Sequence, residues 1–269
     1  MQQKNLIIIL ADISGYTKFM LDNRTSAVHG QLLINGLIES ILAQVDIPLT
    51  LQEIEGDAVF LYAADPGPLG DWRRVIEEVS HKLDKFFAAF ITQSGLSFET
   101  TPCECAICHN AEKLGLKIVV HAGEAVFHTV AGRAQVSGSD VILAHRLLKN
   151  TLASHEYLLL TEQAFALMGE YLPGEFEHHR ETYEGFGTVP VRVRFLEQEF
   201  LQARDSVYLL NDSDLQTAVN GWVEWGVKHI FNAAIQQFHR PIRAFSWLQR
   251  TLMLVEAALA IPVFRLYYR

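Results

Sequence analysis

The chain has 269 residues, of which 49% are hydrophobic and 20% are charged, and this composition excludes a globally disordered protein. Acidic residues outnumber basic ones by 31 to 22, and the net charge of −9 excludes a general binder of nucleic acid, whose phosphates need basic side chains. The three cysteines lie in one short segment, which does not suit a disulfide framework and favours a reducing compartment. We therefore expect a cytoplasmic protein.

Strand and helix patterns alternate along the first part of the chain. Leu6–Leu10 is a short, continuously apolar run typical of a buried strand. Apolar residues at helical spacing predict helices over 28–45 and 72–93. Between these helices, residues 49–54 and 58–62 predict a hairpin with a short turn.

The second part of the domain predicts another antiparallel pair, residues 116–121 and 124–129, with Gly123 near its turn. His178 and His179 fall in a polar segment that we interpret as a loop. The remaining expected elements are helices over 140–150 and 162–171 and strands over 156–160 and 189–196. We therefore expect an α/β (α+β) domain over residues 1–200.

Residues 201–269 predict a helical hairpin appended to that domain. Its first helix is amphipathic from Ser213 to Phe238, and Pro241 begins the second. A tryptophan-rich apolar face fits either a dimer interface or packing onto the chain's own α/β domain, and both alternatives stay open. In-plane contact with a membrane, helped by flanking arginines, is the alternative that we do not favour.

Two acidic residues stand at predicted strand edges. Asp12 follows the first strand and Asp57 lies in the hairpin turn, each close to a glycine, Gly15 or Gly56, which lets a ligand approach the backbone. Two such carboxylates fit a site for Mg²⁺ or Mn²⁺ that substrate phosphates complete. The alternative is a helix cap for Asp12 and an ordinary turn residue for Asp57.

Four segments resemble, in the same order, motifs of the class III nucleotidyl cyclases, the adenylate and guanylate cyclase family. The resemblance spans about residues 5–196 and is strongest to a bacterial cyclase-like branch with a cysteine-rich insert. It implies a ferredoxin-like βαββαβ core with extra elements and a homodimer with nucleotide sites at its interface. The implied reaction converts a nucleoside triphosphate to a 3′,5′-cyclic nucleotide and pyrophosphate. The matching segments are residues 8–17, 53–58, 116–124 and 135–147.

The resemblance implies roles for particular residues. Asp12, Asp57 and the carbonyl of Ile13 match the positions that hold two metal ions, Mg²⁺ or Mn²⁺. Arg146 matches the arginine that faces the developing phosphate charge from the other subunit. Together these four residues would form the catalytic centre.

Two positions depart from the family pattern. Ile142 stands where the family has an asparagine that orients the ribose, and isoleucine cannot form that hydrogen bond. Glu184 falls where many cyclases have a lysine that binds phosphate, and a carboxylate there would repel the polyphosphate. These departures favour a second hypothesis, a non-catalytic cyclase-like module that binds nucleotide or a partner protein in signalling.

The same resemblance implies a base preference. Glu53 and Gln135 occupy the two purine-specifying positions. A carboxylate accepts hydrogen bonds from the N1–H and N2–H groups of guanine, and the glutamine amide can donate to O6. We therefore expect GTP to be favoured over ATP. The alternative is that Glu53 is a solvated strand residue.

The cysteine segment is a second candidate site. Cys103, Cys105 and Cys108, with His109 beside them, have a spacing that can surround a structural Zn²⁺ ion. His109, His121 or a residue of a partner chain could complete the four ligands. The alternative is three reduced thiols in a loop.

Overall fold

The computed structural model describes residues 1–22, 27–68, 70–99 and 113–196. The chain divides into two compact units, Met1–Leu215 and Gln216–Arg269. The predicted helical appendage and the cysteine segment lie outside the described residues, so both stay predictions. Within the described ranges, none of the helices combines the length and the apolar composition needed to cross a membrane.

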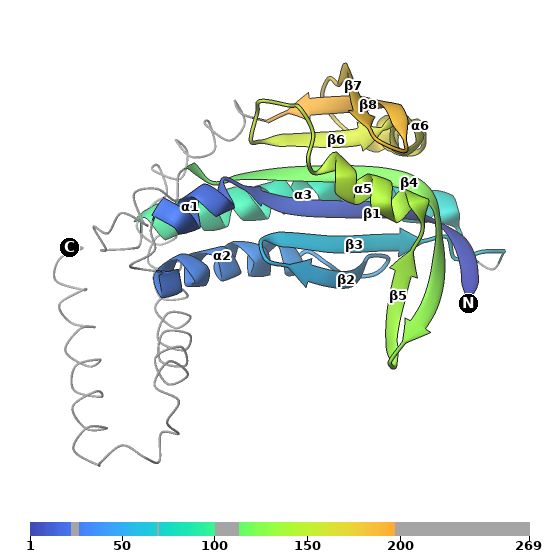
Figure 1. The fold of residues 1–269 in the computed structure, drawn as a ribbon, viewed down its shortest axis with the longest axis horizontal. Coiled ribbons are helices and arrows are strands. Elements are labelled where there is room, and N and C mark those ends of the chain that lie inside the picture. The colour runs from blue at the N-terminus through green and yellow to red at the C-terminus, as the bar shows by residue number, and fades with distance from the viewer. Residues whose placement is uncertain (23–26, 69, 100–112, 197–269) are drawn as a thin grey trace, which may run out of the picture. The chain divides into compact units, whose positions relative to one another are not determined.

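A central mixed sheet of eight strands organises the described residues (Figure 1). Seven strands follow the order β2-β3-β1-β4-β6-β8-β7, and β5 pairs with β4. The strands are β1 (Gln2–Ser14), β2 (Thr50–Glu55), β3 (Ala58–Ala64), β4 (Gly115–Val130), β5 (Arg133–Ser137), β6 (Tyr157–Thr161), β7 (Glu177–Tyr183) and β8 (Gly187–Phe195). The helices are α1 (Tyr16–Asp22), α2 (Ala27–Leu42), α3 (Trp72–Glu99), α5 (Ser139–Leu147) and α6 (Glu162–Met168), followed by the 3₁₀ helix η3 (Gly169–Tyr171).

The first four strands confirm the predicted ferredoxin-like core. In the part β2-β3-β1-β4 every strand is antiparallel to its neighbour. Helices α1 and α2 connect β1 to β2, and α3 connects β3 to β4, as a βαββαβ unit requires. The extra elements extend this core, because β6 joins β4 in parallel and β8 and β7 follow antiparallel.

Both faces of the sheet are covered, and β1 shows why its sequence is continuously apolar. Ile7 and Ile9 pack into a cluster with α2 and α3, whereas Ile8 and Leu10 pack into a cluster with α5 on the other face. A strand buried on both faces has no polar side to show in its sequence. Figure 1 shows α3 and α5 on opposite sides of the sheet.

The predicted pair 116–121 and 124–129 is wrong. Both segments belong to one long strand, β4, whose hairpin partner is β5. The turn lies at Ala131 and Gly132, whose φ angles of 51° and 80° are those of a tight hairpin turn. Gly123 is instead a point of close approach inside the strand.

The polar loop assigned to His178 and His179 is also wrong. These residues lie on β7, an edge strand whose side chains are mostly exposed. His178 Nδ1 is 3.6 Å from Glu162 Oε1, and only Glu181 on this strand is fully buried. An edge strand that exposes most of its side chains has no apolar alternation for sequence analysis to detect.

Candidate functional site

A row of three polar residues crosses three neighbouring strands at one end of the sheet. Asp12 on β1 is paired in register with Lys117 on β4, and Lys117 is paired with Tyr157 on β6. Lys117 Nζ lies 2.7 Å from Asp12 Oδ2. The two side chains are 21% and 15% exposed, so the ion pair is largely removed from water.

Asp57 lies beside this row. The Ile13 N–H donates to the Asp57 carbonyl at 3.3 Å, which ties the β2–β3 turn to the end of β1. Burial raises the pKa of the Asp57 carboxyl to about 6, and the charge of Asp12 adds to the rise. A backbone hydrogen bond and Lys117 oppose that rise. The structure therefore brings together Asp12, Ile13 and Asp57, three residues singled out from the sequence.

The residues present fit a divalent cation. Two carboxylates that share a partly dry site repel each other, as the raised pKa of Asp57 indicates, and a hard cation would relieve that repulsion. Oxygen donors are also the ligands that Mg²⁺ and Mn²⁺ prefer. Among the described residues there is no cluster of three or more His, Cys, Asp or Glu side chains suited to a metal. The donor set is thus the carboxylate pair, with backbone or substrate oxygens needed to complete it.

Sequence reasoning missed Lys117. The residue lies in a segment that resembles a cyclase motif, yet nothing in the one-dimensional pattern places it opposite Asp12. The signal was the strand pairing: β4 begins beside the end of β1, so the two antiparallel strands put an acid and a base at facing positions. Only the register of β1 against β4 makes that pairing visible.

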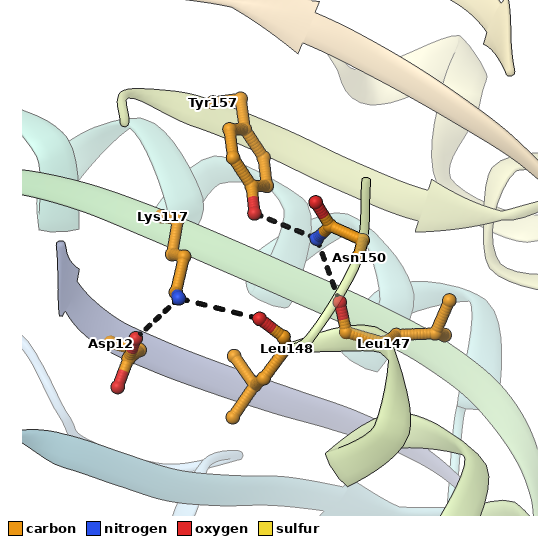
Figure 2. A network of polar contacts seen from close by, with 6 residues as sticks. All are labelled: Asp12, Lys117, Leu147, Leu148, Asn150 and Tyr157. Carbon is orange, nitrogen blue, oxygen red and sulfur yellow. Dashed lines mark hydrogen bonds and ion pairs between the residues drawn. The ribbon is translucent and has the colours of Figure 1, made fainter. Parts of the chain in front are cut away.

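Lys117 has a second partner at the end of α5, as Figure 2 shows. Its Nζ donates to the carbonyl of Leu148 at 3.3 Å. Asn150 Nδ2 donates to the Leu147 carbonyl at 2.8 Å and to the Tyr157 hydroxyl at 2.7 Å. Burial raises the pKa of Tyr157 to about 12, so this hydroxyl keeps its proton at neutral pH. Side chains from β4 and from the loop after α5 therefore satisfy the last carbonyls of the helix.

The glycine of the segment His121-Ala122-Gly123 on β4 has a local structural reason. Asp140 Oδ2 accepts from the Glu124 N–H at 2.7 Å, and Asp140 Oδ1 lies 3.5 Å from His121 Nε2. A Cβ atom on Gly123 would meet Asp140 Oδ2 at 2.2 Å, so only glycine leaves room for this carboxylate. Burial lowers the pKa of His121, while Asp140 opposes that shift. His121 Nδ1 lies 2.9 Å from Thr161 Oγ1, which holds one side of the ring, whereas Nε2 has no hydrogen-bond partner among the described residues.

Arg146 is not the cation that faces the carboxylates within one chain; Lys117 is. Arg146 is exposed on α5, two residues before Leu148. Ile142, one helical turn earlier, is also exposed at 54%. Glu184 is exposed in the turn between β7 and β8. These three positions are therefore open to solvent or to a second chain.

The two purine-specifying candidates lie on strands that touch. Gln52 on β2 donates from Nε2 to the Ala134 carbonyl on β5 at 3.2 Å. Glu53 and Gln135 are the next residues on the same two strands, Glu53 exposed and Gln135 half-buried. Their base-reading role stays a prediction.

Cys103, Cys105, Cys108 and His109 lie outside the described residues. The zinc hypothesis therefore stays a prediction, which elemental analysis of protein purified without chelator would check.

Comparisons of the sequence find a family and a relative whose functions are unknown. A family model described as a protein of unknown function, DUF2652, matches residues 34–157. An uncharacterised protein of Mycobacterium tuberculosis, Rv2561/Rv2562, is 28% identical over 151 residues, which are 56% of this chain and 68% of that protein.

Solved structures of cyclase domains share the fold. The adenylyl cyclase CyaB from P. aeruginosa is similar with a TM-score of 0.52 and 16% identity, over 72% of this chain and 95% of that one. A dimeric guanylyl cyclase domain of the RhoGC fusion protein from Blastocladiella emersonii is similar with a TM-score of 0.51 and 15% identity, over 72% of this chain and 97% of that one. The chain thus has the fold of class III nucleotidyl cyclase domains, as its motifs predict.

Proposed function

We propose that the protein is a nucleotidyl cyclase that converts a nucleoside triphosphate to a 3′,5′-cyclic nucleotide and pyrophosphate. The observation that carries the proposal is the meeting of Asp12 and Asp57 at the strand ends, in a partly buried site. Buried, mutually repelling carboxylates cost stability, and such an arrangement is typical of a functional site. The fold adds weight, because it is the one on which cyclase chemistry is built in the similar structures.

Asp12, Asp57 and the Ile13 carbonyl would hold Mg²⁺ or Mn²⁺. Bound there, the ions would activate the ribose 3′-hydroxyl for attack on the α-phosphorus and neutralise the triphosphate. The chain's own part is to keep the two carboxylates close and partly dry, which strengthens their attraction for a cation. The backbone hydrogen bond from Ile13 to Asp57 fixes the spacing between the end of β1, which carries Asp12, and the β2–β3 turn, which carries Asp57.

Arg146 would act from a second copy of the chain. It is exposed on α5 and is not among the partners of the carboxylates in its own chain. A guanidinium brought in by a partner would meet the charge that develops on the phosphate. The proposal therefore includes a homodimer whose sites are completed across the interface.

Glu53 and Gln135 would read the base, and GTP is the favoured substrate. Glu53 offers acceptors to guanine N1–H and N2–H, and Gln135 offers a donor to O6. The contact between Gln52 and Ala134 supports the pair, because it holds their two strands together.

The test is direct turnover. Purified protein is incubated with each nucleoside triphosphate and Mn²⁺, and mass spectrometry measures cyclic nucleotide and pyrophosphate. Asp57→Asn should lose activity by at least about 100-fold, because it removes a metal ligand without changing side-chain shape. Glu175→Gln is the matched control, since Glu175 is an exposed carboxylate in the loop before β7. Equal activity of Asp57→Asn and the parent protein would refute the assignment.

A non-catalytic nucleotide-binding module is the second candidate. The exposed Ile142 favours it, because an isoleucine side chain has no polar group with which to orient the ribose. Binding of Mn²⁺–GTP with no cyclic product, in protein that is fully folded and dimeric, would select this candidate over the enzyme.

A further inference from the structure

Asp12, a proposed metal ligand, already forms an ion pair with a side chain of its own chain. Lys117 Nζ lies 2.7 Å from Asp12 Oδ2, and both side chains are mostly shielded from water. A divalent ion on Asp12 would lie close to this ammonium and repel it. Lys117 and the metal therefore compete for Asp12.

Lys117 does not lose every partner when it leaves Asp12. An ammonium group has three donors, and one of them already reaches the Leu148 carbonyl at 3.3 Å. That carbonyl is at the C-terminal end of α5, where the helix dipole favours a positive charge. The C-terminal end of α5 thus provides a second binding position for the Lys117 ammonium group.

The same helix end carries Arg146. Leu148 follows Arg146 by two residues, and the Lys149 N–H donates to the Arg146 carbonyl at 2.9 Å. Figure 2 shows how Lys117 reaches from β4 to both Asp12 and this last turn. One side chain therefore links the carboxylate site to the helix end that presents the proposed catalytic arginine.

We propose that Lys117 is a positioning residue that exchanges with a divalent cation at Asp12 and, through the Leu148 carbonyl, holds the helix end that carries Arg146. The inference rests on the proposed function. Without metal, Lys117 neutralises part of the charge of Asp12 and Asp57. With metal, its hold on α5 keeps Arg146 in place while Asp12 is released to the ion.

Metal binding without nucleotide tests the exchange. Free Mn²⁺ is counted by electron paramagnetic resonance in titrations of the parent protein and of Lys117→Met. Removing the competing ammonium should tighten Mn²⁺ binding by about tenfold, since a unit charge a few ångströms away is worth that much or more. The rise in melting temperature on adding Mn²⁺ should also be larger in Lys117→Met than in the parent.

The hold on α5 has its own readout. Hydrogen exchange of residues 144–150, followed by mass spectrometry, should be faster in Lys117→Met, because the Leu148 carbonyl loses its donor. Turnover should fall by about tenfold, with little change in KM, since a misplaced arginine weakens the transition state more than substrate binding. Lys117→Arg, which keeps the charge and the donors, should recover part of the turnover.

Lys149→Met is the matched control. It removes an exposed lysine side chain just after α5 and keeps the backbone hydrogen bond from the Lys149 N–H to the Arg146 carbonyl. It should leave Mn²⁺ affinity, hydrogen exchange and turnover unchanged. If Lys149→Met tightened Mn²⁺ binding as much as Lys117→Met, the effect would be one of general charge and the exchange would be refuted.

Weaker or unchanged Mn²⁺ binding in Lys117→Met would overturn the inference, because a merely structural lysine lowers stability without competing with the metal. Should Lys117→Met not fold, Lys117→Gln removes the charge, keeps a donor for Leu148, and must show the same tightening.

A parent protein that makes no cyclic nucleotide while the Mn²⁺ results appear as expected would refute the proposed function alone. A parent that turns over while Mn²⁺ affinity does not respond to Lys117 would refute this inference alone.

Discussion

Asp57 is a residue whose charge destabilises the fold that holds it. Its pKa is raised to about 6 mainly by burial and then by Asp12, so the ionised form is the less favourable one in the folded protein. Lys117 offsets only part of this cost. A carboxylate that destabilises the fold is typical of a functional site, and binding a cation is a function that this carboxylate would serve.

Asp57→Asn should therefore stabilise the metal-free protein at neutral pH. Folding raises the pKa from its ordinary 3.8 to about 6, so the folded state holds the proton more strongly. The parent then loses stability as the pH rises from about 4 to about 6, and the variant does not. Because Asp57 is only half-buried, the gain above pH 6 is discounted to about 1 kcal/mol, or about 2–4 °C in melting temperature.

Thermal unfolding in the presence of chelator, at several pH values, measures this gain. Glu55→Gln is the control, because Glu55 is an exposed carboxylate just before the same turn. A variant less stable than the parent at pH 7.5 would contradict the account of Asp57.

The base preference also belongs to single side chains. Glu53→Lys together with Gln135→Asp should move the preference from GTP toward ATP. Losing the carboxylate leaves two guanine donors unpaired, at a cost of about 1–3 kcal/mol in binding. Titration calorimetry with both nucleotides and Mn²⁺ measures the change, with Glu55→Lys as the control for added charge on β2. Equal affinity of the parent for GTP and ATP would remove the role from Glu53.

Among the elements, β4 differs most from its prediction, and the reason is physical. A glycine between two apolar runs indicates a turn when only the sequence is known. In the structure Gly123 lies inside the strand, where Asp140, sixteen positions beyond Glu124 along the chain, comes too close for any side chain. A contact of that kind depends on tertiary packing, so the spacing of apolar residues along the sequence does not reveal it. The turn that does end β4, at Ala131 and Gly132, carries a weaker sequence signal.

Gly123→Ala should destabilise the protein by about 1–3 kcal/mol, because Asp140 must turn away from the Glu124 N–H and leave it unpaired. Urea unfolding measures the loss. In an Asp140→Ala background the carboxylate is absent and only the Cβ atom of residue 140, 2.8 Å away, remains, so the same substitution should cost less. Equal costs in the two backgrounds would show that the methyl group clashes with something other than the Asp140 carboxylate.

For the whole molecule, the fold could be predicted from the sequence, while the partners of the site residues could not. Runs of apolar residues and their spacing predicted most of the strands and helices. The family resemblance, and not the spacing, implied the ferredoxin-like core. The meeting of Asp12 and Asp57 followed from the family resemblance. Lys117 did not, because strand register decides which residue faces Asp12. The edge strand β7 escaped detection because most of its side chains face water.

The two faces of the sheet are covered unequally, which bears on assembly. Among the described helices, α5 alone contributes to the cluster built on Ile8 and Leu10, whereas α1, α2, α3 and α6 pack into the other cluster. Half-buried aromatic side chains border the α5 face, namely Tyr62, Phe127, Tyr183, Phe186 and Phe195. In the proposed homodimer, a second copy of the chain on this face would cover them and supply its Arg146 to the carboxylates.

Mixing two inactive variants tests that arrangement. Asp57→Asn lacks a metal ligand, and Arg146→Ala lacks the arginine, so neither should make cyclic nucleotide alone. If each site takes its carboxylates from one chain and its arginine from the other, a mixed dimer has one site with both groups intact. Equal amounts of the two variants, exchanged to equilibrium, form mixed dimers as half of the population, so activity should return to about one quarter of the parent value. Sites built within single chains would stay inactive on mixing, and Arg146 would then have to act on the carboxylates of its own chain, where Lys117 is the cation that forms the ion pair with Asp12.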